Sequence, residues 1–309
     1  MATFAPKCTA FFALVCFLLV YPGAGTSAAG ANEVKSCPPR RSMPLRQDRV
    51  QYYSQIEQDK VVLALFGNQS GGYFIDLAAN DPMHFSNSYS LEQWFGWRGV
   101  CIEPSPMHAA NLRRLRSCHV AQSVVDSEVH EVQFTFSHST LAAIVANDTD
   151  FEEYKRFHIY QEKKGKPLQL RPNVIRTITT TTLAAVLDEV CAPAHIEYFS
   201  LDVEGSEYRV LRNFPFSRYR FSVLTIERPK EPLCLLLHRH GYRLVGLLGT
   251  FYETLWIHHN VSQALLRGGA LGPLRSFPGF SPKFQTVLRP YLTYRRACQE
   301  LHHVVAAFH

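Results

Sequence analysis

Short apolar runs alternate with amphipathic stretches through the middle of the chain. Most of the runs are continuously apolar, which is typical of strands buried on both faces of a parallel sheet. The expected strands are Tyr73–Leu77, Val100–Glu103, His119–Val125, Glu197–Leu201 and Ser222–Ile226. Stretches with helical spacing separate them, so the pattern predicts an α/β doubly wound fold. The expected helices are Asp48–Phe66, Ser88–Phe95, Met107–Ser117, Leu183–Val190, Glu207–Asn213 and Leu233–Gly241.

Three further segments complete this pattern. A hairpin of Tyr242–Leu248 and Glu253–His258 is expected across Gly249 and Thr250, and it would add an antiparallel strand. Glu131–Phe136 is expected to pair beside the third strand. The polar stretch 137–172 is predicted to be an insertion over the top of the sheet.

The two ends of the chain differ from the middle. Phe11–Tyr21 is an apolar run behind Lys7, and small residues up to an Ala29-Gly30-Ala31 site follow it, which is the layout of a secretory signal peptide. No apolar run reaches the ~18 residues that a membrane span needs. An uncleaved anchor is the alternative for this first segment. We predict a signal peptide at 1–31, a Pro-rich linker at 32–47, one domain at 48–260, and a C-terminal extension at 261–309 with a helix at 286–308.

Composition agrees with the secretory pathway. Two of the eight cysteines lie in the targeting segment, which leaves an even number for a disulfide-forming compartment. Glycosylation sequons occur at Asn68, Asn147 and Asn260, in expected loops. The spacing of Cys and His matches no zinc pattern. Net charge is +6 and the basic residues are scattered, so charge gives no reason to predict a nucleic-acid partner.

Acidic residues end four of the expected parallel strands: Asp76, Glu103, Asp202 and Glu227. In open α/β sheets, ligands bind at the carboxyl ends of the strands near the switch point in strand order. Four like charges on one edge are costly unless they have cationic or hydroxyl partners. This edge of the sheet is therefore the predicted functional site.

The first of these strand ends indicates which cofactor the site would take. Asp76 and Glu103 are one βαβ unit apart, and a carboxylate after the second strand usually binds ribose hydroxyls. The loop Ala78-Ala79-Asn80-Asp81-Pro82 contains no glycine. A dinucleotide would need a glycine-rich phosphate-binding turn here, so NAD and an oxidoreductase are disfavoured. S-adenosylmethionine has no phosphates and suits this loop better.

The motifs at these strand ends carry a resemblance to a known family. GGYFIDLAANDPMHFSNSYSLEQWFGWRGVCIEPSP, RTITTTTLAAVLDEV, IEYFSLDVEGSEYRVL and HGYRLVGLLGTFYETLWI follow one another in the same order and spacing as in that family. The chain resembles the FkbM family of S-adenosylmethionine-dependent methyltransferases over about residues 54–258. The resemblance implies a class I (Rossmann-like) methyltransferase fold, with a seven-stranded, mostly parallel sheet, and methyl transfer to oxygen. Animal Star-like proteins, which are associated with secretory trafficking, also resemble this domain.

The resemblance implies a cofactor-binding role for each matching residue. These are Asp76, Leu77, Ala78 and Asn80 for the methionine end, Glu103, Pro104 and Ser105 around the adenosine, and Val125 and Asp126 at the edge of the adenine. Many members have Gly where this chain has Ala78. A methyl group there would crowd the cofactor or demand a φ below zero.

The resemblance also places Asp202 and Glu204 at the mouth of the active site. Asp202 is the expected base for the acceptor hydroxyl, and Glu204 or Glu227 would orient the acceptor. Mg²⁺ could use Asp202 and Glu227, but two ligands at an unknown separation give no metal prediction. Helix capping is the alternative role for Asp76 and Asp202. It is the expected role for the polar pair Asn87 and Ser88, for which contact with the cofactor carboxylate is the alternative.

These observations predict a methyltransferase that uses S-adenosylmethionine and acts on a hydroxyl of a glycan or glycolipid in the secretory pathway. The alternative is a non-catalytic, Star-like binding protein with the same fold. The sequence names no acceptor, because the insertion and the C-terminal extension carry no readable motif.

Overall fold

The computed structural model describes residues 50–136, 142–150, 174–249 and 253–261. All of the described residues belong to one compact unit. The predicted signal peptide, linker and terminal helix lie outside the described residues. So do most of the insertion and, apart from Val261, the C-terminal extension.

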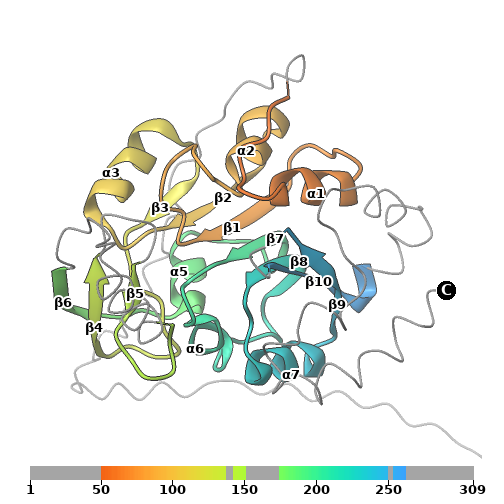
Figure 1. The fold of residues 1–309 in the computed structure, drawn as a ribbon. Helices are drawn as coiled ribbons and strands as arrows, with labels where there is room; N and C mark the ends of the chain where they lie inside the picture. The colour runs from red at the N-terminus through yellow and green to blue at the C-terminus, as the bar shows by residue number, and fades with distance from the viewer. Residues whose placement is uncertain (1–49, 137–141, 151–173, 250–252, 262–309) are drawn as a thin grey trace, which may run out of the picture. The chain divides into compact units, whose positions relative to one another are not determined.

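Seven strands form the main sheet (Figure 1). Side by side, they are β3 (His119–Ala121), β2 (Arg98–Ile102), β1 (Tyr73–Leu77), β7 (His195–Leu201), β8 (Arg220–Glu227), β10 (Glu253–His258) and β9 (Tyr242–Leu248). Neighbours from β3 to β8 are parallel, and β10 is antiparallel to both of its neighbours. The predicted seven-stranded, mostly parallel sheet with a terminal hairpin is confirmed. The strand order reverses between β1 and β7, which is where open α/β sheets bind their ligands.

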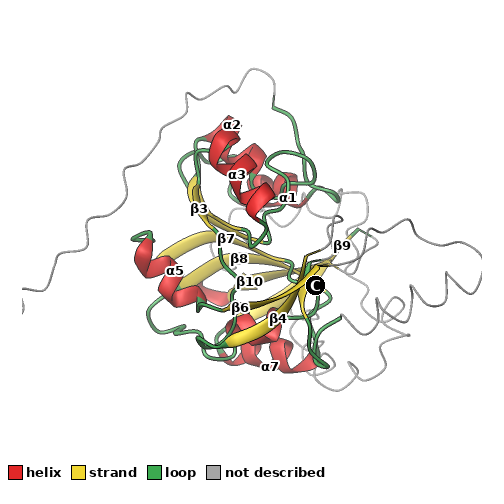
Figure 2. Ribbon diagram, turned by 90° about the vertical axis from the view of Figure 1, so that its left-hand side faces the viewer, coloured by secondary structure: helices red, strands yellow, loops and turns green. Residues whose placement is uncertain are grey.

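Helices cover both faces of this sheet (Figures 1 and 2). One face carries α1 (Gln58–Leu65), α2 (Tyr89–Phe95) and α3 (Pro106–Leu115), and the other carries α5 (Leu183–Glu189), α6 (Glu207–Leu211) and α7 (Glu231–Arg239). Along β1, Phe74 packs in the core under α1, α2 and α3, and Ile75 packs in the core under α5, α6 and α7. Neither side chain is exposed. Each central strand must therefore be apolar on both faces, as the continuous runs indicated. In the described part of the chain, no helix is long and apolar enough to cross a membrane.

A second, three-stranded sheet lies beside the β3 side of the main sheet (Figure 1). Its strands are β5 (Ala143–Ile144), β4 (Glu131–Phe136) and β6 (Val174–Thr179). The prediction that Glu131–Phe136 pairs beside the third strand is therefore wrong, because β4 pairs antiparallel with β5 and β6. Val132 and Phe134 are buried while Glu131 and Gln133 are exposed, which is the pattern of an antiparallel sheet covered on one face; Thr135 departs from it, because it is buried too. The sequence analysis predicted no strand at β6.

Two expected elements are shorter in the structure. The first helix begins at Gln58 rather than at 48, because the buried Asp59 carboxylate accepts hydrogen bonds from Tyr53 N and Ser54 Oγ. Those bonds hold residues 53–54 in an extended loop. The third strand ends at Ala121 instead of Val125. The segment Ser123–Val125 forms part of a cavity wall instead.

A disulfide joins two neighbouring strands of the main sheet. Cys101 on β2 and Cys118 before β3 are bonded, with their Cα atoms 6.0 Å apart. Cys191 is also disulfide-bonded, and the buried Cys234 thiol donates to the carbonyl of Pro229 at 3.8 Å. The sequence analysis had not predicted which cysteines are bonded to each other.

Candidate active site

The four predicted acids all lie at the carboxyl edge of the main sheet. Asp76 is in β1, Glu103 follows β2, Asp202 follows β7, and Glu227 ends β8. Because β7 pairs with both β1 and β8, this edge is continuous. Its two halves differ in chemistry.

The half formed by β1, β2 and β3 opens into an apolar cavity of about 370 Å³, part of it open to solvent. The enclosed part of this space is about 40 Å³, and the rest is continuous with solvent. One wall comes from the strand ends and consists of Leu77, Ala78, Pro104, Ser123, Val124 and Val125. The other residues come from the small sheet and from the loop after β7: Phe134, Ala142, Ala143, Ile144, Val203 and Ser206. We call this space the apolar cavity.

The loop after β1 adopts the backbone that glycines would favour. Ala78 has φ 69° and Asn80 has φ 48°. The expectation that alanine at 78 demands a φ below zero is therefore wrong. The amides of Ala78 and Ala79 donate to the carbonyl of Ile102 at 2.9 and 3.2 Å, and these bonds hold the turn against the end of β2.

Glu103 fixes the same loop from the other side. Its Oε2 accepts a hydrogen bond from Asn80 N at 2.9 Å, and its Oε1 accepts one from Ser105 N at 2.7 Å. Burial raises the pKa of this carboxyl, while the two amide bonds act in the opposite direction. Glu103 thus ties together the loops after β1 and β2, whose Ala78 and Pro104 line the apolar cavity, although Glu103 itself is not a lining residue. Each oxygen keeps further acceptor capacity.

Asp76 points away from the apolar cavity. The hydroxyl of Ser88 donates to its Oδ2, and Arg116 in turn donates to Ser88 Oγ at 2.9 Å. Burial raises the pKa of Asp76. Asn87 and Ser88 were expected to cap α2, but the Ser88 side chain makes no cap bond. Asn87 instead donates to Ser200 Oγ at 2.9 Å.

Val125 and Asp126 have separate positions. Val125 lines the apolar cavity, whereas Asp126 is not among the lining residues. The Asp126 carboxylate binds Arg209 Nε at 3.1 Å and His130 Nε2 at 3.0 Å, and these bonds lower its pKa despite the opposing effect of burial. The structure therefore shows Asp126 as the centre of an ion-pair network behind the cavity wall.

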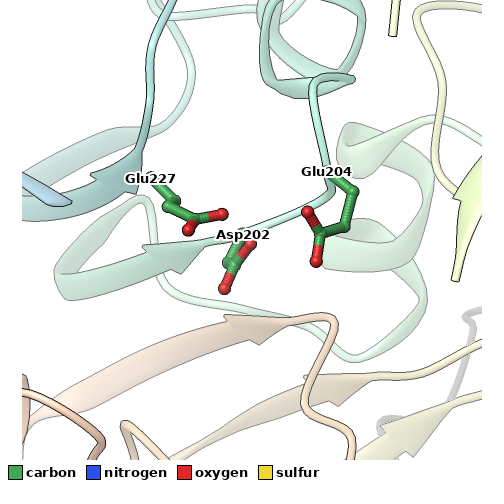
Figure 3. A group of neighbouring side chains, drawn as sticks. All are labelled: Asp202, Glu204 and Glu227. Atoms are coloured by element: carbon green, nitrogen blue, oxygen red, sulfur yellow. The ribbon is translucent and has the colours of Figure 1, made fainter. Parts of the chain in front are cut away.

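The other half of the edge holds a group of acids that we call the acidic cluster: Asp202, Glu204 and Glu227. One oxygen from each lies within 4.8 Å of the others, and Figure 3 shows the three side chains converging. Arg228 Nη2 contacts Glu204 at 2.9 Å and Glu227 at 3.0 Å. Oxygens at this spacing suit a hard divalent cation. Here the guanidinium of Arg228 supplies the positive charge.

Asp202 is the most perturbed member of the acidic cluster. Its Oδ1 is buried without a hydrogen-bond partner in the described part of the chain. Burial, with the charges of Glu227 and Glu204, raises the pKa of Asp202 well above its usual range. Asp202 does not cap α6, since Ser206 occupies the N-cap position. The capping alternative for Asp202 is therefore excluded.

Two further acids, Glu253 and Glu207, belong to this region, and the sequence analysis missed Glu253. Glu253 begins β10, lies opposite Glu227 in the strand register and is 4% exposed. Burial raises its pKa to about 8, and burial does the same to Glu207, whose carboxylate accepts a hydrogen bond from Gly205 N at 3.0 Å. The sequence could have indicated Glu253, because it is an acid at the start of the apolar strand β10. An antiparallel β10 beside β8 would place it next to Glu227, the acid that ends β8.

The order of the main sheet, with one antiparallel strand in the last place but one, is that of the class I methyltransferases. The family model described as "Methyltransferase FkbM domain" matches residues 76–244, more than half of the chain. The chain therefore belongs to the FkbM methyltransferase family.

Comparisons with solved structures and with curated proteins add no further evidence on function. The chain is similar to the crystal structure of precorrin-6y C5,15-methyltransferase from Geobacter metallireducens GS-15, with a TM-score of 0.34 and 10% identity. That match covers 68% of this chain and 94% of the other. The comparison with curated proteins found no match.

Proposed function

We propose that this methyltransferase transfers the methyl group of S-adenosylmethionine to a hydroxyl oxygen. The observation that carries the proposal is the junction of the two halves of the edge. The loop after β7 contributes Val203 to the wall of the apolar cavity, and the residues on either side of Val203 are Asp202 and Glu204. The acidic cluster is therefore adjacent in the chain to the wall of the apolar cavity, so we place the acceptor there.

The β1–β3 half supplies the binding groups. The adenine would lie in the apolar cavity against Pro104 and Val125. Glu103 would accept hydrogen bonds from the ribose hydroxyls with the acceptor capacity that its amide bonds leave. The loop Leu77–Asn80 would face the methionine end, and Ser105 holds Glu103 in place. Asp76 and Asp126 would act from behind these residues, through Ser88 and Arg209.

The acidic cluster supplies the groups for the reaction. When bound, S-adenosylmethionine provides an electrophilic methyl group on a sulfonium. Asp202 would accept the proton that the acceptor hydroxyl loses, and its raised pKa makes it a stronger base than an ordinary carboxylate. Glu204 and Glu227, held by Arg228, would orient the acceptor.

A glycan or glycolipid is the acceptor class that we propose. Carboxylates are acceptors only, and a sugar offers several hydroxyl donors in a small volume. The acidic cluster therefore matches a polyhydroxyl group better than it matches an anionic or apolar one.

We place this activity in the secretory pathway. The disulfides at Cys101–Cys118 and Cys191 support an oxidising compartment. The sequon residues Asn68 and Asn147 are exposed in turns, and Asn260 is exposed in helical residues 259–261 rather than in the expected loop. Expressed in eukaryotic cells, the protein should begin near Asn32 and shift on a gel after glycosidase treatment. A cytosolic chain starting at Met1 without a glycan shift would refute this location.

Titration calorimetry with S-adenosylmethionine, followed by transfer of a labelled methyl group to a mixed glycan extract, tests the function. Binding together with label in the glycan fraction supports it. Binding with label in another class of acceptor keeps the methyltransferase and removes the glycan. If neither binding nor transfer is found, the protein is better described as the Star-like binding module.

A further inference from the structure

The apolar cavity contains one buried hydroxyl without a partner. Ser206 lines the cavity and is 2% exposed, and its Oγ has no hydrogen-bond partner among the described residues. Ser206 is the N-cap residue of α6, but its side chain makes no cap bond. The hydroxyl therefore has no role within the helix.

A buried hydroxyl without a partner lowers the stability of a folded protein, because it has lost its water and gained nothing in return. Mutation to alanine would remove that cost at a site where no internal bond is lost. The described residues offer this hydroxyl no partner, and a ligand in the cavity can supply one. The lining around it is otherwise apolar apart from Ser123, so a ligand in the cavity has few polar groups to meet.

We propose that Ser206 Oγ determines the specificity of the apolar cavity, by a hydrogen bond to the polar edge of a planar base. The inference rests on the proposed function, in which that base is the adenine of the cofactor. Apolar residues from the strand ends and from Phe134 and Ile144 of the small sheet would contact the two faces of the ring. The hydroxyl both donates and accepts, so it can pair with the amino group or with a ring nitrogen.

The first test compares Ser206→Ala with the wild type. Titration with S-adenosylhomocysteine should give a dissociation constant about tenfold higher for Ser206→Ala, as expected when a single hydrogen bond is lost. The thermal midpoint of the ligand-free variant should be equal to or above that of the wild type. A merely structural serine would give the reverse, a lower midpoint with unchanged affinity.

A matched control is available in Ser127. Its Oγ is also buried without a partner in the described chain, at 6% exposure, but Ser127 does not line the apolar cavity. Ser127→Ala should leave the dissociation constant unchanged. If it weakens binding as much as Ser206→Ala does, the effect is not local and the proposal is wrong.

The second test changes the ligand. S-inosylhomocysteine replaces the amino group of the base by a carbonyl and so alters the polar edge alone. The wild type should distinguish it from S-adenosylhomocysteine, and Ser206→Ala should distinguish the two less. Equal discrimination by both proteins, with binding intact, would overturn the role of Ser206 and leave the proposed function standing. If the wild type binds neither ligand, the proposed function fails as well.

Discussion

The apolar cavity and the acidic cluster lie on one edge of one sheet, yet they are built in opposite ways. Around the cavity, the charged groups are turned back into the protein, where Asp76 and Asp126 each bind a partner. In the cluster, carboxylates face one another, and Asp202 keeps an unpaired oxygen. The cavity favours binding of a planar ring between apolar side chains. The acidic cluster offers carboxylate oxygens that can accept hydrogen bonds or a proton from a substrate.

This difference follows from the strands themselves. β1, β2 and β3 end in loops that hydrogen-bond to one another, so their polar groups are satisfied before any ligand arrives. β7, β8 and β10 each bring an acid to this part of the edge, and Arg228 pairs with Glu204 after β7 and with Glu227 of β8. The β1–β3 half is therefore preorganised. In the acidic half, repulsion between buried carboxylates lowers the stability of the fold, which is typical of functional sites.

The largest effect is expected from Asp202→Asn. This change keeps the shape and removes the proton acceptor, so the rate of methyl transfer should fall by ~10²–10⁴ while cofactor affinity is unchanged. Initial rates with labelled cofactor and calorimetry measure the two quantities. Asp188→Asn, at an exposed ion pair with Arg218 on the surface of α5, is the matched control and should keep full activity. Full activity in Asp202→Asn would mean that another group takes the proton.

Glu103→Gln should change cofactor binding by the β1–β3 half and leave the acidic cluster unaffected. Removing the charge while keeping one carbonyl oxygen should weaken cofactor binding about ten- to a hundredfold, the loss of a charge-assisted bond of ~1.5–3 kcal/mol. The rate at saturating cofactor should stay close to that of the wild type. Glutamine is preferred to alanine, since its one carbonyl oxygen can still accept from the amide of Asn80 or of Ser105, whereas alanine would leave both amides without their acceptor.

Glu197 provides the control for Glu103. It is also a strand acid that accepts a backbone hydrogen bond, from Tyr73 N at 2.7 Å, but it lies near the amino ends of β1 and β7. Glu197→Gln should not change cofactor affinity. Equal dissociation constants for wild type and Glu103→Gln would remove Glu103 from the ribose site.

The acidic half should also determine how stability depends on pH. Burial raises the pKa of Glu253 from 4.5 to about 8, so the folded state binds a proton that the unfolded state releases. The contribution is complete below about pH 4.5 and is lost as pH rises through about 8, with a slope of up to ~1.4 kcal/mol per pH unit. Urea unfolding between pH 6 and pH 9 should show this fall. In Glu253→Gln the fall should be shallower, and parallel curves for the two proteins would contradict the assignment.

The smallest effect is expected at Ala78. An alanine at φ 69° carries strain of ~1–2 kcal/mol, which Ala78→Gly relieves, while glycine costs ~0.4–1 kcal/mol through the unfolded chain. The net result should be a gain of ~0.5 kcal/mol in the free energy of unfolding. Ala79, whose φ is not positive, should lose stability on the same change. If both variants lose stability, the left-handed turn at 78 does not cost what its backbone angle implies.

The sequence predicted the main sheet well, because strands buried on both faces leave continuous apolar runs. The acids after those runs could be assigned to one edge for the same reason. The turn at Ala78 could not be predicted, since alanine has no preference for a left-handed backbone and only the bonds to Ile102 and Glu103 impose it.

Other features depended on contacts between distant segments. The small sheet joins residues near 131 to residues near 174, and no local pattern specifies that pairing. Likewise the family resemblance implied that Asp126 lies at the edge of the adenine. Its partner Arg209 comes from α6, which is far along the chain. The proposed role of Ser206 rests on a buried hydroxyl without a hydrogen-bond partner among the described residues, and a sequence does not show which hydroxyls lack a partner.

The place of β10 has a consequence for how the protein is made. β10 is the last described strand along the chain, but it lies inside the sheet, and β9 contacts the sheet's edge only through it. The hairpin of β9 and β10 must therefore dock on β8 as one unit, after residue 258 has left the ribosome. Until then the edge of β8 is open and Glu253 is absent from beside Glu227. The growing chain can complete its binding half early, but it acquires its full set of acids only at the final step of assembly.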